Sequence, residues 1–197
     1  MPVKSAMLKI AEHIRNTIEH LNDREIDSMI SAINGAERLF LIGTGRSGLV
    51  ARAFAMRLVQ LGLTVYVVGE TTSPAISEKD LLIAVSGSGE TNSVVSAAQI
   101  AKKLGVKILT VTSYPDSSLG KISDYIVTIK GRTKIDIEKD HMKSQLEGRM
   151  TPLTPLGTLF EDTVMIFFDG VIARLMTHLG REESYMKKQH AKLEWFY

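Results

Sequence analysis

The sequence contains no cysteine among its 197 residues. This absence excludes disulfide bonds, thiolate nucleophiles and cysteine-ligated metal sites. The five histidines do not stand at the spacing of metal ligands, and there is no H-E-x-x-H motif and no acidic cluster of the metal-binding type. The sequence therefore predicts that the protein has no metal site.

The sequence also lacks a large excess of positive or negative charge, and it lacks a long apolar run. The 24 lysines and arginines against 22 aspartates and glutamates give a net charge of +2, which argues against nucleic acid or an anionic membrane as the main partner. No apolar run is long enough to cross a bilayer, and residues 1–20 lack the continuous apolar core of a signal peptide. We therefore expect a cytoplasmic protein.

Short apolar runs are present instead, and from residue 39 onward they alternate with longer segments. The expected strands are Leu39–Ile42, Thr64–Val68, Leu81–Val85, Lys107–Val111 and Tyr125–Ile129. Strands that are apolar throughout and separated by helices indicate a parallel sheet with helices on both faces. The sequence thus predicts an α/β fold.

Segments with helical spacing surround these strands. Residues 5–33 are expected to form helices, the second of which covers Arg24–Asn34. Further helices are expected at Ser47–Leu61, Thr91–Leu104, Ser118–Ile122, Thr158–Leu179 and Glu182–Tyr197. We expect one domain, with N-terminal helices at 5–34, an α/β core at about 36–180 and a C-terminal helix at 182–197. Residues 132–150 are dense in charge without a clear period, which fits a surface loop or an irregular helix.

Two glycine-rich loops follow strands and precede helices. The first is Gly43-Thr44-Gly45-Arg46-Ser47-Gly48, and the second is Ser86-Gly87-Ser88-Gly89-Glu90-Thr91. Backbone N–H groups and a helix N-terminus converge in such a loop, which suits it to binding an anion. Because no long basic cluster accompanies the loops, a small phosphorylated metabolite is the expected ligand.

Other interpretations of the two loops stay open. The first matches the dinucleotide pattern G-x-G-x-x-G, with Glu70 as the ribose-binding acid, although Glu70 lies later than the usual spacing. Its glycines are also compatible with a tight turn that only permits close packing. The second loop can be a flexible turn in which Ser or Thr caps a helix.

Three polar side chains near the C-terminus are further candidates. Glu161 and Asp162 lie in the first turn of an apolar helix, where the helix dipole favours carboxylates. Successive helical residues point in different directions, so one of the two can reach a pocket, but spacing alone does not choose between them. His190 lies in a charged helix, where an exposed histidine with no function is the plain interpretation.

Several segments together resemble the sugar isomerase (SIS) domain, and within it they look most like the 6-phospho-3-hexuloisomerase group. These segments are Gly45-Arg46-Ser47-Gly48, Phe54-Ala55-Met56-Arg57-Leu58, Val68-Gly69-Glu70-Thr71, Ser86–Thr91 and Pro155-Leu156-Gly157-Thr158-Leu159-Phe160-Glu161. The likeness covers nearly the whole chain. Only residues 132–150 depart from it, since they are longer and more charged than the resemblance leads us to expect.

The resemblance implies a three-layer sandwich with a five-stranded, parallel, flavodoxin-like sheet and extra helices at both ends. It implies a homotetramer with active sites shared between subunits. The implied reaction interconverts D-arabino-hex-3-ulose 6-phosphate and D-fructose 6-phosphate through a cis-enediol, with no cofactor. This step follows the fixation of formaldehyde onto ribulose 5-phosphate, or runs backwards to make pentose.

The resemblance also implies roles for particular residues. Glu161 is the expected proton acceptor, and His190 matches a C-terminal histidine that can enter the site of a neighbouring subunit. The expected substrate-binding residues are Gly45, Arg46, Ser47, Ser86, Gly87, Ser88, Gly89, Glu90 and Thr91. The oxygen of the developing enediolate needs a donor, for which Arg46, a loop N–H or His190 is available.

Three competing functions remain at this stage. The chain can be another SIS isomerase, acting on arabinose 5-phosphate or sedoheptulose 7-phosphate. It can be a phosphosugar-sensing regulatory domain, although no basic recognition helix precedes the first strand. The glycine turn is also compatible with a third function, that of a nicotinamide-dependent oxidoreductase.

Overall fold

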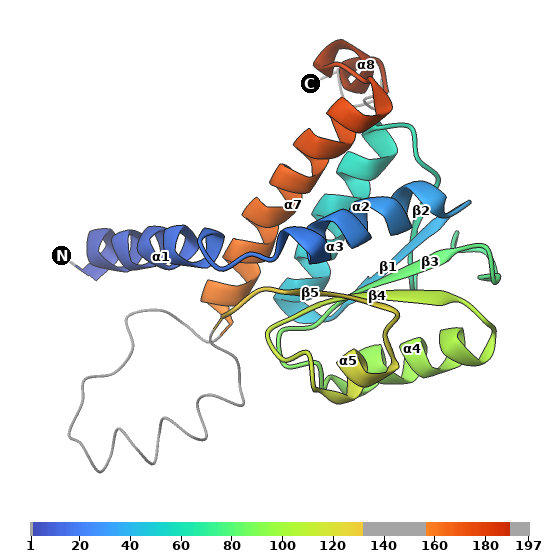
Figure 1. The fold of residues 1–197 in the computed structure, drawn as a ribbon, viewed down its shortest axis with the longest axis horizontal. Coiled ribbons are helices and arrows are strands. Elements are labelled where there is room, and N and C mark those ends of the chain that lie inside the picture. The colour runs from blue at the N-terminus through green and yellow to red at the C-terminus, as the bar shows by residue number, and fades with distance from the viewer. Residues whose placement is uncertain (1, 132–156, 190–197) are drawn as a thin grey trace.

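The computed structural model describes residues 2–131 and 157–189. Two helices, α1 (Pro2–Ile18) and α2 (Asp23–Gly35), precede the sheet. Helix α1 extends away from the body of the molecule (Figure 1), and Thr17 is its only buried residue. The charged segment 132–150 and His190, which lies near the C-terminus, were both singled out from the sequence and lie outside the described residues.

Five parallel strands form a single sheet in the order β2-β1-β3-β4-β5. They are β1 (Leu39–Gly43), β2 (Val65–Val67), β3 (Leu81–Val85), β4 (Lys107–Thr112) and β5 (Tyr125–Thr128). This order is the flavodoxin-like one, so the expected fold class is confirmed. Strand β3 is buried at every residue, as expected for a central strand covered on both faces.

The helices associated with the sheet lie close to their predicted positions except the last, because only residues up to 189 of the predicted helix 182–197 are described. They are α3 (Gly45–Gln60), α4 (Asn92–Lys103), α5 (Ser118–Ile122), α7 (Thr158–Leu179) and α8 (Glu183–Lys188). Glycines in the left-handed conformation, Gly105 and Gly180, follow α4 and α7, as the sequence predicts.

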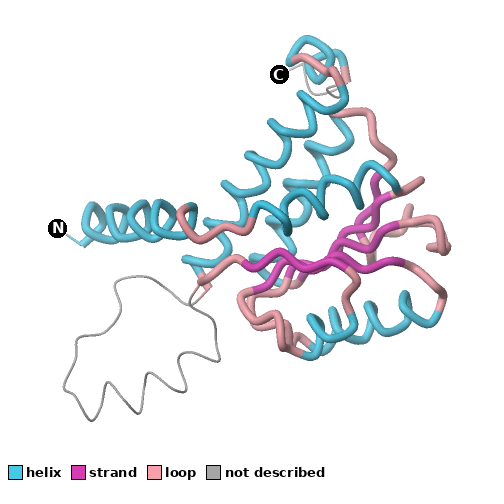
Figure 2. The backbone as a smooth tube through the Cα atoms, in the orientation of Figure 1, coloured by secondary structure: helices cyan, strands magenta, loops and turns pink. Residues whose placement is uncertain are grey.

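Alternate residues of the strands enter two separate cores. Leu39 and Leu41 of β1 pack on the side of α2, α3 and α7, whereas Phe40 and Ile42 pack on the side of α4 and α5. Figure 2 shows the resulting three layers, with the sheet between the two sets of helices. On the larger side the rings of Phe54 and Phe168 are stacked, with their centroids 4.0 Å apart, which joins α3 to α7.

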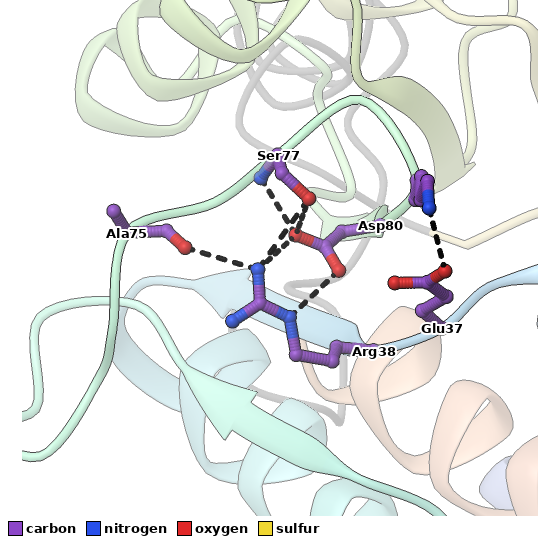
Figure 3. A network of polar contacts seen from close by, with 6 residues as sticks. Glu37, Arg38, Ala75, Ser77 and Asp80 are labelled. Atoms are coloured by element: carbon purple, nitrogen blue, oxygen red, sulfur yellow. Dashed lines mark hydrogen bonds and ion pairs between the residues drawn. The ribbon is translucent and has the colours of Figure 1, made fainter.

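A polar network ties together the amino ends of β1 and β3 (Figure 3). Arg38 precedes β1 and donates from Nε and Nη2 to the two carboxylate oxygens of Asp80, which precedes β3, at 2.8 and 2.7 Å. Ser77 donates its N–H and its hydroxyl to Asp80 Oδ2. Burial opposes ionisation of Asp80, but these hydrogen bonds outweigh it and lower the pKa of its carboxyl.

The two glycine-rich loops follow β1 and β3 and therefore lie at the other, carboxyl ends of these strands.

Among the described residues, no helix has the length and apolar character needed to cross a membrane.

Candidate active site

The two glycine-rich loops meet where the strand order reverses. Gly43 ends β1 and is paired with Val85, which ends β3. The chain passes from β1 to β2 on one side of β1, while β3 lies on the other side. In open α/β sheets, ligands bind outside the carboxyl ends of the strands at this switch point. The topology thus brings both predicted anion-binding loops to one place.

The first loop is held close to the start of α3 by its glycines. A Cβ on Gly48 would lie 2.8 Å from the carbonyl oxygen of Gly43, and Gly45 has a φ of +57°. Thr44 occupies the N-cap position without a side-chain cap. Helix α3 therefore begins tightly against the strand, and the first-turn N–H groups receive no hydrogen bond from the Thr44 hydroxyl.

The second loop is organised from within by Ser86. Its buried hydroxyl accepts a hydrogen bond from the N–H of Gly89 and lies 3.1 Å from the Thr91 hydroxyl. Gly89 has a φ of +65°, and a Cβ there would lie 1.9 Å from Ser117 Oγ. Glu90 turns away and accepts a hydrogen bond from the N–H of Ser118, which lowers the pKa of the Glu90 carboxyl.

The predicted binding residues of the second loop thus separate into two groups. Ser86, Gly89 and Glu90 shape the loop, whereas Gly87, Ser88 and Thr91 line the cavity beside it.

The start of α7 carries the two carboxylates that spacing alone could not tell apart and between which the family resemblance favoured Glu161. Gly157, in the left-handed conformation with a φ of +82°, precedes the helix and accepts a hydrogen bond from the N–H of Glu161. A Cβ on Gly157 would lie 3.0 Å from either carboxylate oxygen of Glu161, so the glycine makes room for that side chain. The side chain of Glu161 is 13% exposed and lines the cavity, whereas that of Asp162 is 37% exposed and does not.

One cation of the first loop contacts both carboxylates at the start of α7. Arg46 donates from Nε to Glu161 Oε2 at 2.5 Å and from Nη2 to Asp162 Oδ1 at 2.9 Å. The hydrogen bond with Glu161 is the main reason that the pKa of Arg46 is raised. Residues 115 positions apart in the sequence are thereby joined at the cavity.

The cavity has a volume of about 410 Å³, which suits a small metabolite. It is lined by Thr44, Gly45, Arg46, Ser47, Gly87, Ser88, Thr91, Gly157, Phe160 and Glu161. Phe160 was not predicted as a site residue, because an aromatic residue at the start of an apolar helix is typical of a core. Its place next to Glu161 in the motif was the available signal.

Other candidates lie outside this cavity. Glu70 forms an ion pair with Arg52 and lines a separate pocket beside β2. It is therefore not in the cavity that the glycine turn lines, and the dinucleotide interpretation gains no support from it. Within residues 2–131 and 157–189, no group of three or more histidines and acidic residues is arranged to hold a metal ion.

Comparison with known proteins shows the family of the chain. The profile of the SIS domain matches residues 32–144. The chain belongs to the SIS domain family. The match covers both glycine loops and all five strands, so the resemblance predicted from the sequence is confirmed.

Three relatives span almost the whole chain. An uncharacterized protein of Aeropyrum pernix is 46% identical and covers 98% of this chain and 93% of its own length. The 3-hexulose-6-phosphate isomerase of Bacillus subtilis is 36% identical, over 98% of this chain and all of its own. A crystal structure from Methanococcus jannaschii, for which a 3-hexulose-6-phosphate isomerase function was inferred, aligns with a TM-score of 0.78 at 34% identity, over 93% of this chain and 96% of its own.

Proposed function

We propose that the protein is a 6-phospho-3-hexuloisomerase, which interconverts D-arabino-hex-3-ulose 6-phosphate and D-fructose 6-phosphate. The observation that carries this proposal is the position of Glu161, whose largely buried carboxylate shares one cavity with two anion-binding loops. Full-length similarity to proteins with this name supports the choice among SIS isomerases.

The phosphate group of the sugar would bind at the switch point. Helices α3 and α4 both begin there, and their N-terminal N–H groups favour a negative charge. The hydroxyls of Ser47, Ser88 and Thr91 are on residues that line the cavity and supply further donors. Binding of the distal phosphate would hold the reacting carbons at a fixed position relative to Glu161.

The proton transfer needs a single carboxylate. Glu161 would take the proton from C2 of the 3-ketose, the C–H electron pair would form the C2=C3 bond, and the carbonyl oxygen on C3 would become negative. In the cis-enediolate the remaining hydroxyl proton can pass between the adjacent oxygens. Glu161 would then return its proton to C3, which yields the 2-ketose. C2 is oxidised and C3 is reduced in the same molecule, so there is no net redox change and no added reactant is needed.

The proposal extends to a homotetramer with shared active sites. Helix α1 exposes Val3, Met7 and Leu8 to between 65% and 71%, and such surface favours contact with another subunit. An apolar pocket of about 380 Å³ lies where α1 meets α7 and is lined in part by Ile14, Ile18, Ile166 and Phe167. In such an assembly His190 of one subunit would act in the site of another.

A coupled assay tests the proposed reaction. Formaldehyde and ribulose 5-phosphate are condensed enzymatically to the 3-ketose. The fructose 6-phosphate formed is converted to glucose 6-phosphate by added glucose 6-phosphate isomerase and followed through glucose 6-phosphate dehydrogenase. We expect turnover that depends on the protein. Turnover of arabinose 5-phosphate or sedoheptulose 7-phosphate in place of the 3-ketose would contradict the proposal, as would tight binding of phosphosugars without any isomerisation. In the cell the enzyme would act in the cytoplasm, in the ribulose monophosphate pathway.

A further inference from the structure

A single arginine stands between two neighbouring carboxylates at the cavity. Arg46 contacts Glu161 through Nε and Asp162 through Nη2. The side chain of Arg46 is 55% exposed, so it has room to move, whereas that of Glu161 is 13% exposed. Arg46 and Glu161 line the cavity, but Asp162 does not.

This arrangement conflicts with simple base catalysis by Glu161. The Nε–H of Arg46 occupies Oε2 of the Glu161 carboxylate, which a base has to present to the carbon-bound proton. At the same moment, the oxygen of the enediolate acquires a negative charge, and among the described residues that line the cavity only Arg46 carries a positive charge. The positive charge is therefore needed at the sugar oxygen when Glu161 becomes protonated.

We propose that Arg46 moves its hydrogen bond from Glu161 to the enediolate oxygen during the reaction, with Asp162 as the positioning residue that keeps hold of its Nη2. This inference rests on the proposed function. As the proton passes from carbon to Glu161, the carboxylate loses its charge and the substrate oxygen gains one. Arg46 then donates to that oxygen, and the return of the proton to carbon restores the original pair.

The charges of the three side chains fit this sequence. Before the reaction they sum to −1, because two carboxylates face one guanidinium. Once Glu161 is neutral, Asp162 alone balances Arg46, and the negative charge resides on the sugar. Because Asp162 lies outside the cavity lining, it can retain Arg46 without contacting the substrate.

Two phosphorylated ligands separate this role from phosphate binding. In 4-phospho-D-erythronohydroxamate a planar, acidic hydroxamate replaces C2 and C3, so it imitates the enediolate. Sorbitol 6-phosphate has no carbonyl and keeps the phosphate. For Arg46→Met we expect an affinity loss of about tenfold or more for the hydroxamate, a change of less than about threefold for sorbitol 6-phosphate, and a fall in kcat of about 100-fold.

The remaining variants test the positioning role. Asp162→Asn should lower kcat by about tenfold with little change in KM, and Arg46→Lys should recover part of the kcat lost in Arg46→Met. The matched control is Arg52→Met, which removes another exposed arginine of α3 that pairs with a carboxylate, Glu70, outside the cavity. Its kcat should not change.

Specific outcomes would overturn the inference. Equal losses of both ligands in Arg46→Met would assign Arg46 to the phosphate, and an unchanged kcat would make the contact a surface ion pair. If one of these two results is obtained and the unaltered protein still turns over the 3-ketose, the inference about Arg46 is wrong but the proposed function stands. If the unaltered protein neither turns over the 3-ketose nor binds the hydroxamate, the proposed function itself is wrong.

Discussion

Gly87 lies directly against the ring of Phe160, so that a Cβ on this glycine would stand 2.9 Å from ring atom Cδ1. The contact joins the loop after β3 to the first turn of α7. Since Phe160 precedes Glu161, the distance between the second glycine-rich loop and the Glu161 carboxylate depends on Gly87, a residue without a side chain.

Gly87→Ala should therefore reduce activity without unfolding the protein. The added methyl group must displace the Phe160 ring or the loop by several tenths of an ångström. Misplacement of this order costs about 10- to 100-fold in kcat/KM when it alters the alignment of reacting groups. Steady-state assays and a circular dichroism spectrum check both parts of the prediction.

Gly170→Ala is the matched control for this substitution. Gly170 also lies in α7, but no atom is within 4 Å of a Cβ built there. The variant should keep its activity and gain about 0.5–1 kcal/mol of stability, because alanine is the better helix former. An activity loss as large as that of Gly87→Ala would show that any change in this helix is harmful.

Glu161→Gln should abolish turnover while fructose 6-phosphate binds within an order of magnitude of its original affinity. The amide has nearly the shape of the carboxylate but cannot accept the carbon-bound proton. Stopped assays together with calorimetric titration measure the two quantities. If the variant keeps more than a few per cent of the activity, another group is the base.

The two serines of the second loop should respond differently to alanine. Ser88 lines the cavity, so Ser88→Ala should weaken binding of fructose 6-phosphate by about 1.5–3 kcal/mol, the contribution of a hydrogen bond to a charged group. Ser86 holds the loop from inside, so Ser86→Ala should lower both affinity and melting temperature. Unchanged affinity in Ser88→Ala would remove its hydroxyl from the phosphate site.

Asp80 should make the stability of the fold sensitive to acid. Because the pKa of Asp80 is lowered in the folded state, its contribution is fully present above the ordinary aspartate pKa of about 3.9 and is lost as the pH falls through the lowered value. Asp80→Asn should lower the melting temperature at pH 7 by about 6 °C or more, and by progressively less as the pH falls below the ordinary aspartate pKa.

Glu37, which lies beside this network (Figure 3), forms an exposed ion pair with Lys79 that provides the control. Glu37→Gln should change the melting temperature by less than about 2 °C, since both side chains are more than 60% exposed. A loss in Asp80→Asn that is the same at pH 3 and pH 7 would contradict the ionic explanation.

A mixing experiment tests whether His190 acts across subunits. The His190→Ala and Glu161→Gln proteins should each be inactive, and subunit exchange between them should restore part of the activity, because some mixed sites then contain both native groups. Exchange is verified with differently tagged chains. If exchange occurs and activity does not return, His190 either serves its own subunit or has no catalytic role.

The strands, helices and glycine loops were predictable because their signals are local. Apolar runs mark the strands, and the loop compositions mark the turns after β1 and β3. The order of the sheet followed from the family resemblance rather than from these patterns. Even the short helix Ser118–Ile122 has the predicted boundaries.

The finer geometry depends on contacts between distant segments and could not be predicted. The inward direction of the Ser86 hydroxyl requires the left-handed turn at Gly89, and that turn is packed against Ser117. The family resemblance favoured Glu161, but the geometry that brings Glu161 rather than Asp162 into the cavity depends on Gly157 and on how α7 docks beside the loops. The bonds from Arg46 to α7 leave no trace in the spacing of either segment.

The Arg38–Asp80 pair lies at the opposite end of β1 from the cavity, about 16 Å away at the usual rise of a five-residue strand. Free-energy changes at sites this far apart, without shared partners, generally add. Protein engineers can therefore expect to alter substrate preference through the loops and heat tolerance through the amino edge in separate campaigns. Because the effects add, substitutions selected separately in the loops and at the amino ends of the strands should keep their individual effects when they are combined.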